Sequence, residues 1–204
     1  MKTFSNRYIF IYITVMVTII ALLLTVVSLG LKPMRENNQQ IEKTQQILKA
    51  AGYGKIDKKE AIALFNEVSE RDDLNGEEAY NIQCADGTQG HVLYEKGKGL
   101  WGPIWGYVVL SDDFTTVKGV VFAHKSETPG LGDRITEDAF QQAFIGKKLY
   151  DKNGNFVSVR VLPAGREGGI SDDNRVDAIS GATLTSKGVD EMMKGMGKEL
   201  RIKN

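Results

Sequence analysis

The first long feature of the hydrophobic pattern is an unbroken apolar block over residues 8–31, which holds no charged side chain. A helix needs roughly 20 apolar residues to cross the hydrocarbon layer of a membrane. A cleaved signal peptide has a shorter apolar core, about 7–15 residues, and ends in a small-residue cleavage site. Here Lys32, Pro33 and Arg35 follow the block directly. The pattern therefore predicts a short tail over residues 1–7 and a membrane-spanning helix over residues 8–31.

Beyond this block, apolar positions recur at helical spacing on a largely polar background. Residues 34–52 predict a helix that ends at Gly52. Asp57 and Glu60 have the spacing of a capping box, which would begin a second helix. We therefore expect residues 32–78 to form a helical stalk or accessory segment.

From residue 79 onward, the pattern changes to short apolar runs separated by turn residues. Such runs are typical of β-strands, and the Asn153-Gly154 dipeptide is typical of a tight turn before a strand. Strands that follow one another directly, with helices at the ends, favour an α+β fold with an antiparallel sheet. One short helix is expected with Thr136 as its N-cap, and a longer one near the C-terminus. The expected strands cover residues 80–84, 90–95, 103–110, 117–124, 156–162 and 175–179.

Composition excludes several classes of function. The residues after the apolar block carry 24 of the 26 lysines and arginines and all 26 acidic side chains, so this part is close to neutral. Without a basic stripe, a nucleic-acid partner has no electrostatic support. The single Cys84 allows no internal disulfide framework, and His91 and His124 are too scattered to form a metal site. Close to the apolar block, Lys2 and Arg7 precede it and Lys32 and Arg35 follow it, so charge does not predict the membrane orientation.

Two glycine-rich segments are candidates for a ligand site. The segment KSETPGLGDRI, residues 125–135, follows an expected strand and places Gly130 and Gly132 on either side of Leu131. Glycine lets a flat ligand approach the main chain closely, although a plain strand-to-helix turn has the same composition. The segment GKGLWG surrounds Trp101 with glycines, so this ring either packs on a core or stacks on a ring-shaped ligand.

The segment DAISGATLTSKGV, residues 177–189, places small and hydroxyl side chains at the junction of an expected strand and an expected helix. A helix N-terminus presents unpaired N–H groups and partial positive charge, which suit a phosphate. The alternative is an ordinary helix start, in which Thr185 or Ser186 caps the first turn. Spacing alone leaves both interpretations open.

The sequence from Asp177 to Thr183 has the form D-x-x-S-G-A-T, which resembles the flavin-attachment motif of the FMN-binding domain family. ETPGLGD, GKGLWG and GKKLYD resemble further signatures of the same family. In that family the threonine that closes SGAT bears FMN through a phosphoester bond, placed there by a dedicated flavin transferase. The resemblance implies an FMN-binding domain over residues 79–204 and covalent FMN on Thr183. It implies no separate catalytic residue, because the flavin carries the redox chemistry.

The resemblance also implies which residues surround the flavin and what the chain does. Relatives with a single anchor and these motifs relay electrons as flavin-bearing members of sodium-translocating NADH:quinone reductases, which are redox-driven translocases, or of Rnf-type ion-translocating ferredoxin:NAD oxidoreductases. GKGLWG and GKKLYD favour the first complex, whereas the aspartate of GLGD and the short chain favour the second. The implied cofactor contacts are Trp101, Glu127, Thr128, Gly130, Leu131, Gly132, Ser180, Gly181, Ala182, Leu184 and Thr185.

Membership of such a complex would make other membrane subunits its partners. By analogy with the family, the chain would lie in a bacterial inner membrane with its soluble domain in the periplasm. A different class of function is also compatible with the residues. In that alternative the chain is a membrane-anchored binding or scaffold module, and its SGAT turn only begins a helix.

Overall fold

A computed structural model describes residues 5–74, 77–165 and 169–200 of the chain. The chain divides into two units, Met1–Glu42 and Lys43–Asn204. Helix α1, Asn6–Ala50, makes up the described part of the first unit and continues into the second. The sequence predicted separate helices on either side of Pro33, but this proline lies inside the continuous α1.

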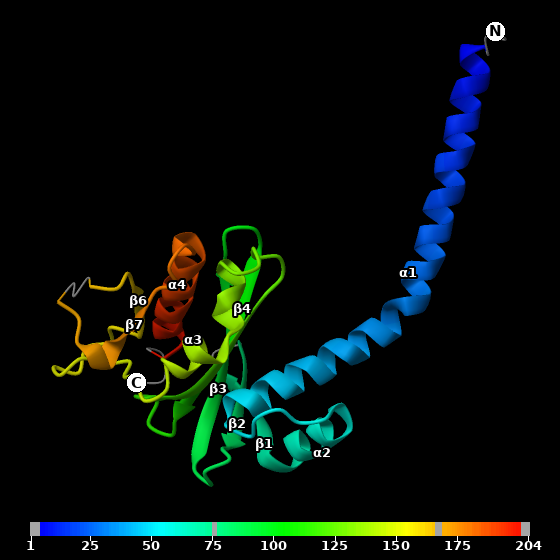
Figure 1. The fold of residues 1–204 in the computed structure, drawn as a ribbon. Helices are drawn as coiled ribbons and strands as arrows, with labels where there is room; N and C mark the ends of the chain where they lie inside the picture. Colours follow the sequence, from blue (N-terminus) through cyan, green and yellow to red (C-terminus); the bar gives the residue numbers. More distant parts are fainter. Residues whose placement is uncertain (1–4, 75–76, 166–168, 201–204) are drawn as a thin grey trace. The chain divides into compact units, whose positions relative to one another are not determined.

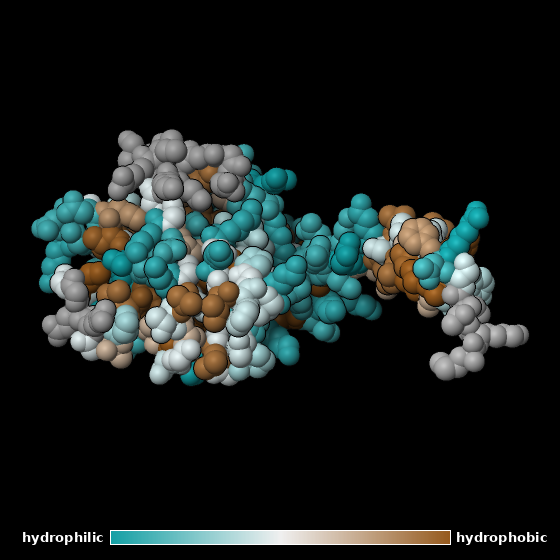
Figure 2. Space-filling model, turned by 90° about the horizontal axis from the view of Figure 1, so that it is seen from above, coloured by the Kyte–Doolittle hydropathy of each residue, from teal (hydrophilic) through white to brown (hydrophobic). Residues whose placement is uncertain are grey.

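The apolar block forms the N-terminal part of α1. Among the described residues, α1 is the one helix long and apolar enough to cross a membrane. Its large apolar side chains between residues 8 and 31 are 44–74% exposed (Figure 2). Monomeric soluble proteins rarely expose so large a continuous apolar surface to water. The structure therefore supports the predicted membrane anchor.

The second unit is built on a five-stranded sheet in which each strand pairs antiparallel with the next along the chain (Figure 1). Strand β4 is apolar on both faces because both faces of the sheet are covered. This sheet and its flanking helices confirm the predicted fold class. The strands are β1 (Ser69–Leu74), β2 (Glu77–Gln83), β3 (Gln89–Lys98), β4 (Pro103–Ser111) and β5 (Val117–His124).

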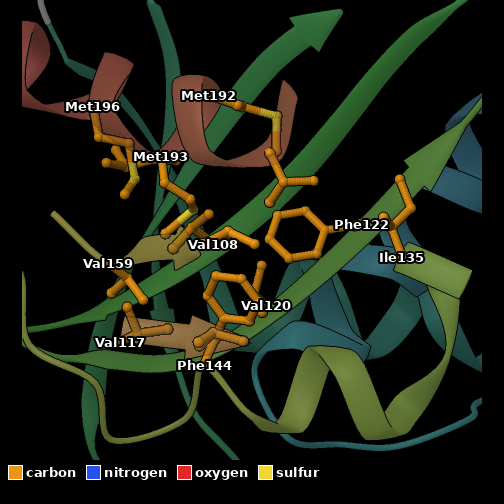
Figure 3. Packing of buried hydrophobic residues seen from close by; sticks show 14 of the residues in the cluster. Val108, Val117, Val120, Phe122, Ile135, Phe144, Val159, Met192, Met193 and Met196 are labelled. Atoms are coloured by element: carbon orange, nitrogen blue, oxygen red, sulfur yellow. The ribbon is translucent and has the colours of Figure 1, made fainter. Parts of the chain in front are cut away.

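Helix α4, Thr183–Leu200, covers one face of the sheet (Figure 1). Its methionines Met192, Met193 and Met196 pack against strand residues that include Val108 and Phe122 (Figure 3). The helix approaches β3 closely because both contacting positions are glycine. A Cβ at Gly97 would lie 3.2 Å from Met192 Cβ, and one at Gly188 would collide with the carbonyl oxygen of Lys98.

The opposite face is covered by the last turns of α1 and by α2, Lys58–Val68. Ile47 and Leu48 of α1 are completely buried there. Strand β1 pairs with β2 and so belongs to the sheet. The compact unit spans Lys43–Asn204. The strand was missed because it is an edge strand with a polar sequence, SERDDL, of which only Leu74 is buried.

Short elements join the sheet to α4. They are the 3₁₀ helices η1 (Gly132–Thr136) and η2 (Asp172–Asn174), helix α3 (Asp138–Gln142), and strands β6 (Arg160–Leu162) and β7 (Arg175–Asp177). Strands β6 and β7 form a separate parallel pair. Two predictions about this region were wrong.

The expected strand over residues 156–162 is reduced to β6. Ser158 interrupts it with a φ of 62°, and its hydroxyl donates to the carbonyl of Met193. Thr136 is also not a helix N-cap. It ends η1 and donates to the carbonyl of Asp133, while Glu137 occupies the N-cap position of α3. The break at Ser158 depends on a contact with Met193, 35 residues away, which a local pattern does not contain.

Candidate functional site

A cavity of about 180 Å³ lies where the loop after β5, the loop between β3 and β4, and the first turn of α4 meet. Nine of its ten lining residues are among those that the resemblance implied. The tenth, Leu100, stands inside GKGLWG beside Trp101, which was the residue predicted there. The lining consists of Leu100, Glu127, Thr128, Leu131, Gly132, Gly181, Ala182, Thr183, Leu184 and Thr185.

The turn before α4 places the start of the helix at the cavity. Gly181 has a φ of 81°, a conformation that side chains disfavour, and Ala182 is buried. In the part of the chain that the structure describes, the backbone N–H groups of Thr183, Leu184 and Thr185 have no hydrogen-bond partner. The first N–H of α4 that is paired within the turn belongs to Ser186, which donates to Ala182.

The hydroxyls that could have capped this turn are used elsewhere. Thr185 Oγ1 donates to Glu127 Oε2 at 2.5 Å, and Ser186 Oγ accepts from the N–H of Ile179 at 3.1 Å. Neither side chain satisfies the first turn of its own helix. The helix end therefore keeps three N–H donors and the positive end of its dipole for a ligand.

Glu127 is the buried polar centre of the site, with 5% of its surface exposed. Its Oε1 accepts the backbone N–H of Trp101 at 2.9 Å, and its Oε2 accepts the hydroxyl of Thr185. Its own N–H donates to Nδ1 of His124 at 3.1 Å, which gives that histidine a structural role. Glu127 thus connects all three segments that surround the cavity.

Two glycines make room for this carboxylate. A Cβ at Gly132 would collide with Glu127 Oε2 and lie 2.7 Å from Thr185 Oγ1. A Cβ at Gly99 would collide with Glu127 Oε1. The glycines of GLGD and GKGLWG at these positions are therefore explained by close packing around Glu127.

Exposed apolar side chains adjoin the cavity. Leu100, Trp101, Leu131 and Leu184 are 43–67% exposed. Leu100, Leu131 and Leu184 line the cavity, and Trp101 follows Leu100 in the same loop. At about 180 Å³ the cavity is below the range of about 300–1,000 Å³ that encloses most small ligands. A ligand larger than the cavity would extend over these exposed side chains.

Three residues implied by the resemblance do not line the cavity. Trp101 has an exposed ring and meets the site through its backbone N–H, while Trp105 packs against the core on the opposite face of the sheet. Gly130 has a φ of 76° in the loop that carries Leu131, and Ser180 is exposed in the turn before α4. They belong to the same loops as the lining residues.

Farther along α4, an ionic cluster holds the helix to β6. Asp190 accepts from Arg160 at 2.8 Å, from Lys194 at 2.5 Å and from the N–H of Val161 at 2.9 Å. Burial acts to raise the pKa of Asp190, but the hydrogen bonds from Arg160 and Lys194 outweigh it and hold this pKa below its ordinary value. The cluster fixes the body of the helix whose first turn forms the site.

The residues around the cavity lie within a region that matches a known protein family. The model of the FMN-binding domain family matches residues 99–196, a range that contains every residue lining the cavity. The crystal structure of the C subunit of Na(+)-translocating NADH-quinone reductase from Parabacteroides distasonis is 33% identical to this chain. The alignment covers 83% of this chain and 96% of that one, with a TM-score of 0.72. This chain belongs to the FMN-binding domain family that includes these reductase subunits.

Other members of this family agree with that assignment. The corresponding reductase subunit from Neisseria meningitidis is 40% identical over 113 residues, which is 55% of this chain and 42% of that protein. The chain thus aligns with less than half of the length of this curated relative. The crystal structure of Shewanella oneidensis NqrC is 25% identical, with a TM-score of 0.64 over 80% of this chain and 97% of that one. The family assignment supports FMN as the ligand of the site.

Proposed function

We propose that this chain is a membrane-anchored subunit that carries covalent FMN on Thr183 and relays electrons within a sodium-translocating NADH:quinone oxidoreductase. One observation carries the proposal: α4 begins at the exposed Thr183 with three N–H groups that have no partner among the described residues, beside a glycine-framed cavity. An anion at a helix N-terminus is stabilised by such donors and by the helix dipole. The family that this region matches is named for FMN, whose phosphate is such an anion.

The residues of the chain fit this cofactor in three ways. The Thr183 side chain is exposed, so its hydroxyl is accessible for a phosphoester bond made by a flavin transferase. The backbone N–H groups of Thr183, Leu184 and Thr185, which have no partner in the described part of the chain, would hold the phosphate. The walls at Leu131 and Leu184 offer apolar surface to a flat ring. Bound FMN would supply the electron-transfer chemistry, and the chain would position it.

The exposed side chains next to the cavity support a role in electron relay. A cofactor enclosed on all sides exchanges electrons slowly with another protein, whereas the small cavity and its apolar surroundings would leave part of the ring accessible. Helix α1 would hold this domain at the membrane, among the other subunits of the complex. We place the chain in a bacterial inner membrane, with the domain in the periplasm, by analogy with the family.

The decisive experiment is co-expression of the full chain with a flavin transferase. We expect a band that fluoresces under ultraviolet light on a denaturing gel, and a mass increase that corresponds to FMN. Thr183→Val should abolish both signals. Thr136→Val, which changes an exposed threonine outside the cavity, should leave both intact. A colourless wild-type band with the bare polypeptide mass would refute the covalent flavoprotein.

The complex itself needs a separate test. Mild detergent solubilisation of native membranes should co-purify the chain with other membrane subunits, which mass spectrometry can identify. Recovery of a lone chain that retains its electron-transfer activity would contradict the subunit role and leave the flavin assignment untouched.

A further inference from the structure

Glu127 makes contacts that a simple ligand for FMN would not need. Both oxygens of its carboxylate already accept hydrogen bonds within the protein, one from Trp101 N–H at 2.9 Å and one from Thr185 Oγ1 at 2.5 Å. The donors lie 26 and 58 residues away along the sequence. The carboxylate therefore joins two distant walls of the cavity.

The packing around these bonds leaves little freedom. Gly99 and Gly132 stand so close to the carboxylate that a Cβ at either position would collide with it. Thr185 is 1% exposed and Glu127 is 5% exposed, so water does not compete for the bond between them. A charge-assisted hydrogen bond in such surroundings is stronger than a neutral one.

The two donors are placed where they control the cavity. Thr185 lies in the first turn of α4, two residues after Thr183. Fixing Thr185 therefore fixes the direction of the turn that bears the attachment hydroxyl. The Trp101 N–H belongs to the residue after Leu100, which lines the other wall.

The charge of Glu127 is not neutralised by an ion pair. Two hydrogen bonds donated to its two oxygens match the ionised form, which only accepts. Within the described residues, no lysine, arginine or histidine forms a salt bridge with it. A negative charge in the wall of a site of low dielectric opposes the addition of an electron nearby.

We propose that Glu127 is a positioning residue that joins the Trp101 loop to the first turn of α4 and, by its charge, lowers the reduction potential of the flavin. The inference rests on the proposed function and deepens it, because it assigns the tuning of the cofactor to one side chain. It predicts two separable effects. The hydrogen bond to Thr185 governs how readily flavin is attached, and the charge governs the potential.

The charge is tested with the full-length flavinylated protein. Glu127→Gln keeps the shape of the side chain and removes its charge. We expect the ratio of reduced to oxidised flavin at a fixed ambient potential to rise about tenfold. This corresponds to a rise of ~59 mV in the reduction potential of a one-electron couple. The matched control is Glu191→Gln, the same change at a 62%-exposed carboxylate on α4, which should leave the potential at the wild-type value. An unchanged potential in Glu127→Gln would refute the electrostatic role.

The positioning role is tested at Thr185. Thr185→Val removes the donor, and we expect about tenfold slower attachment of FMN by the transferase, measured by mass spectrometry over time. Thr185→Ser keeps the hydroxyl and should restore the wild-type rate. Attachment at the wild-type rate in Thr185→Val would refute the positioning role, even if Glu127→Gln fails to fold.

A third measurement does not depend on flavin. In the flavin-free protein, Glu127→Gln and Thr185→Val should each lower the thermal midpoint, and the double variant should fall by less than the two shifts together. Additive shifts would show that the two side chains do not act as a pair. A wild-type protein that takes up no flavin would instead refute the proposed function, and this cycle would still test the pairing.

Discussion

The first turn of α4 and the body of the helix differ in how their polar groups are paired and their apolar side chains are buried. In the first turn, Thr183 and Leu184 are exposed and three N–H groups lack a partner among the described residues. From Val189 onward the inward side chains are buried, and the ionic cluster of Asp190 ties the helix to β6. One helix thus combines an unsatisfied end with a densely packed body.

The difference indicates how the fold maintains a ligand site. An uncapped helix start lowers stability by about 1 kcal/mol relative to a capped one. Packing of the rest of the helix against β3 compensates for that loss of stability. The same contacts also fix the position of the first turn. Buried residues in the body of α4 should therefore affect stability without affecting cofactor attachment.

The largest effect on stability is expected from Met193→Ala. Met193 is completely buried in the core of the α4 face (Figure 3), and truncation would leave a cavity. We expect a loss of about 3 kcal/mol in the free energy of unfolding, measured by urea titration of the full chain in detergent. The attached FMN per folded molecule should stay at the wild-type level. A parallel loss of flavin attachment would contradict the view that the body of α4 governs stability and its first turn governs attachment.

A smaller effect is expected from Asp190→Asn, about 2 kcal/mol at pH 7, because the hydrogen bonds from Arg160 and Lys194 lose their charged acceptor. The pKa of Asp190 is lowered in the folded protein. Its contribution is therefore fully present above the unfolded pKa of about 3.9 and is lost as the pH falls through the lower folded value. The difference between wild type and Asp190→Asn should shrink below about pH 4, as measured by unfolding at several pH values. A constant difference would show that the charge is not its source.

The sequence predicted those parts of the fold that have a strong local pattern. The apolar block, the strands at residues 103–110 and 117–124, and the fold class all follow from periodicity and composition. Strand β1 and the break at Ser158 were missed, because an edge strand is polar and a positive φ is imposed by tertiary contacts. Pairing partners distant in sequence, such as the parallel β6 and β7, leave no local signal.

The site shows the same limit. Motifs identified most of the residues that line the cavity, since glycine-rich loops and a helix start can be read locally. They did not show that Glu127 joins Trp101 to Thr185, or that Leu100 and not the Trp101 ring lines the wall. Which atom faces which depends on how three distant segments pack, and a single sequence does not contain that geometry.

The smallest effect on stability is expected at Ser186, where the first turn of α4 meets the body of the helix. Ser186 is 1% exposed, and its Oγ accepts the N–H of Ile179 in the turn before α4. Ser186→Ala would leave that buried N–H unpaired and should cost about 1 kcal/mol. Because the bond also shapes the turn that carries Thr183, flavin attachment should slow by a few-fold as well, measured by mass spectrometry over time. Ser180→Ala, at an exposed hydroxyl of the same turn, is the control and should leave stability within about 0.5 kcal/mol of wild type. If Ser186→Ala lowers stability while attachment remains at the wild-type rate, flavin attachment does not depend on this bond. Ser186 then belongs to the packed body of α4 and not to the first turn that forms the site.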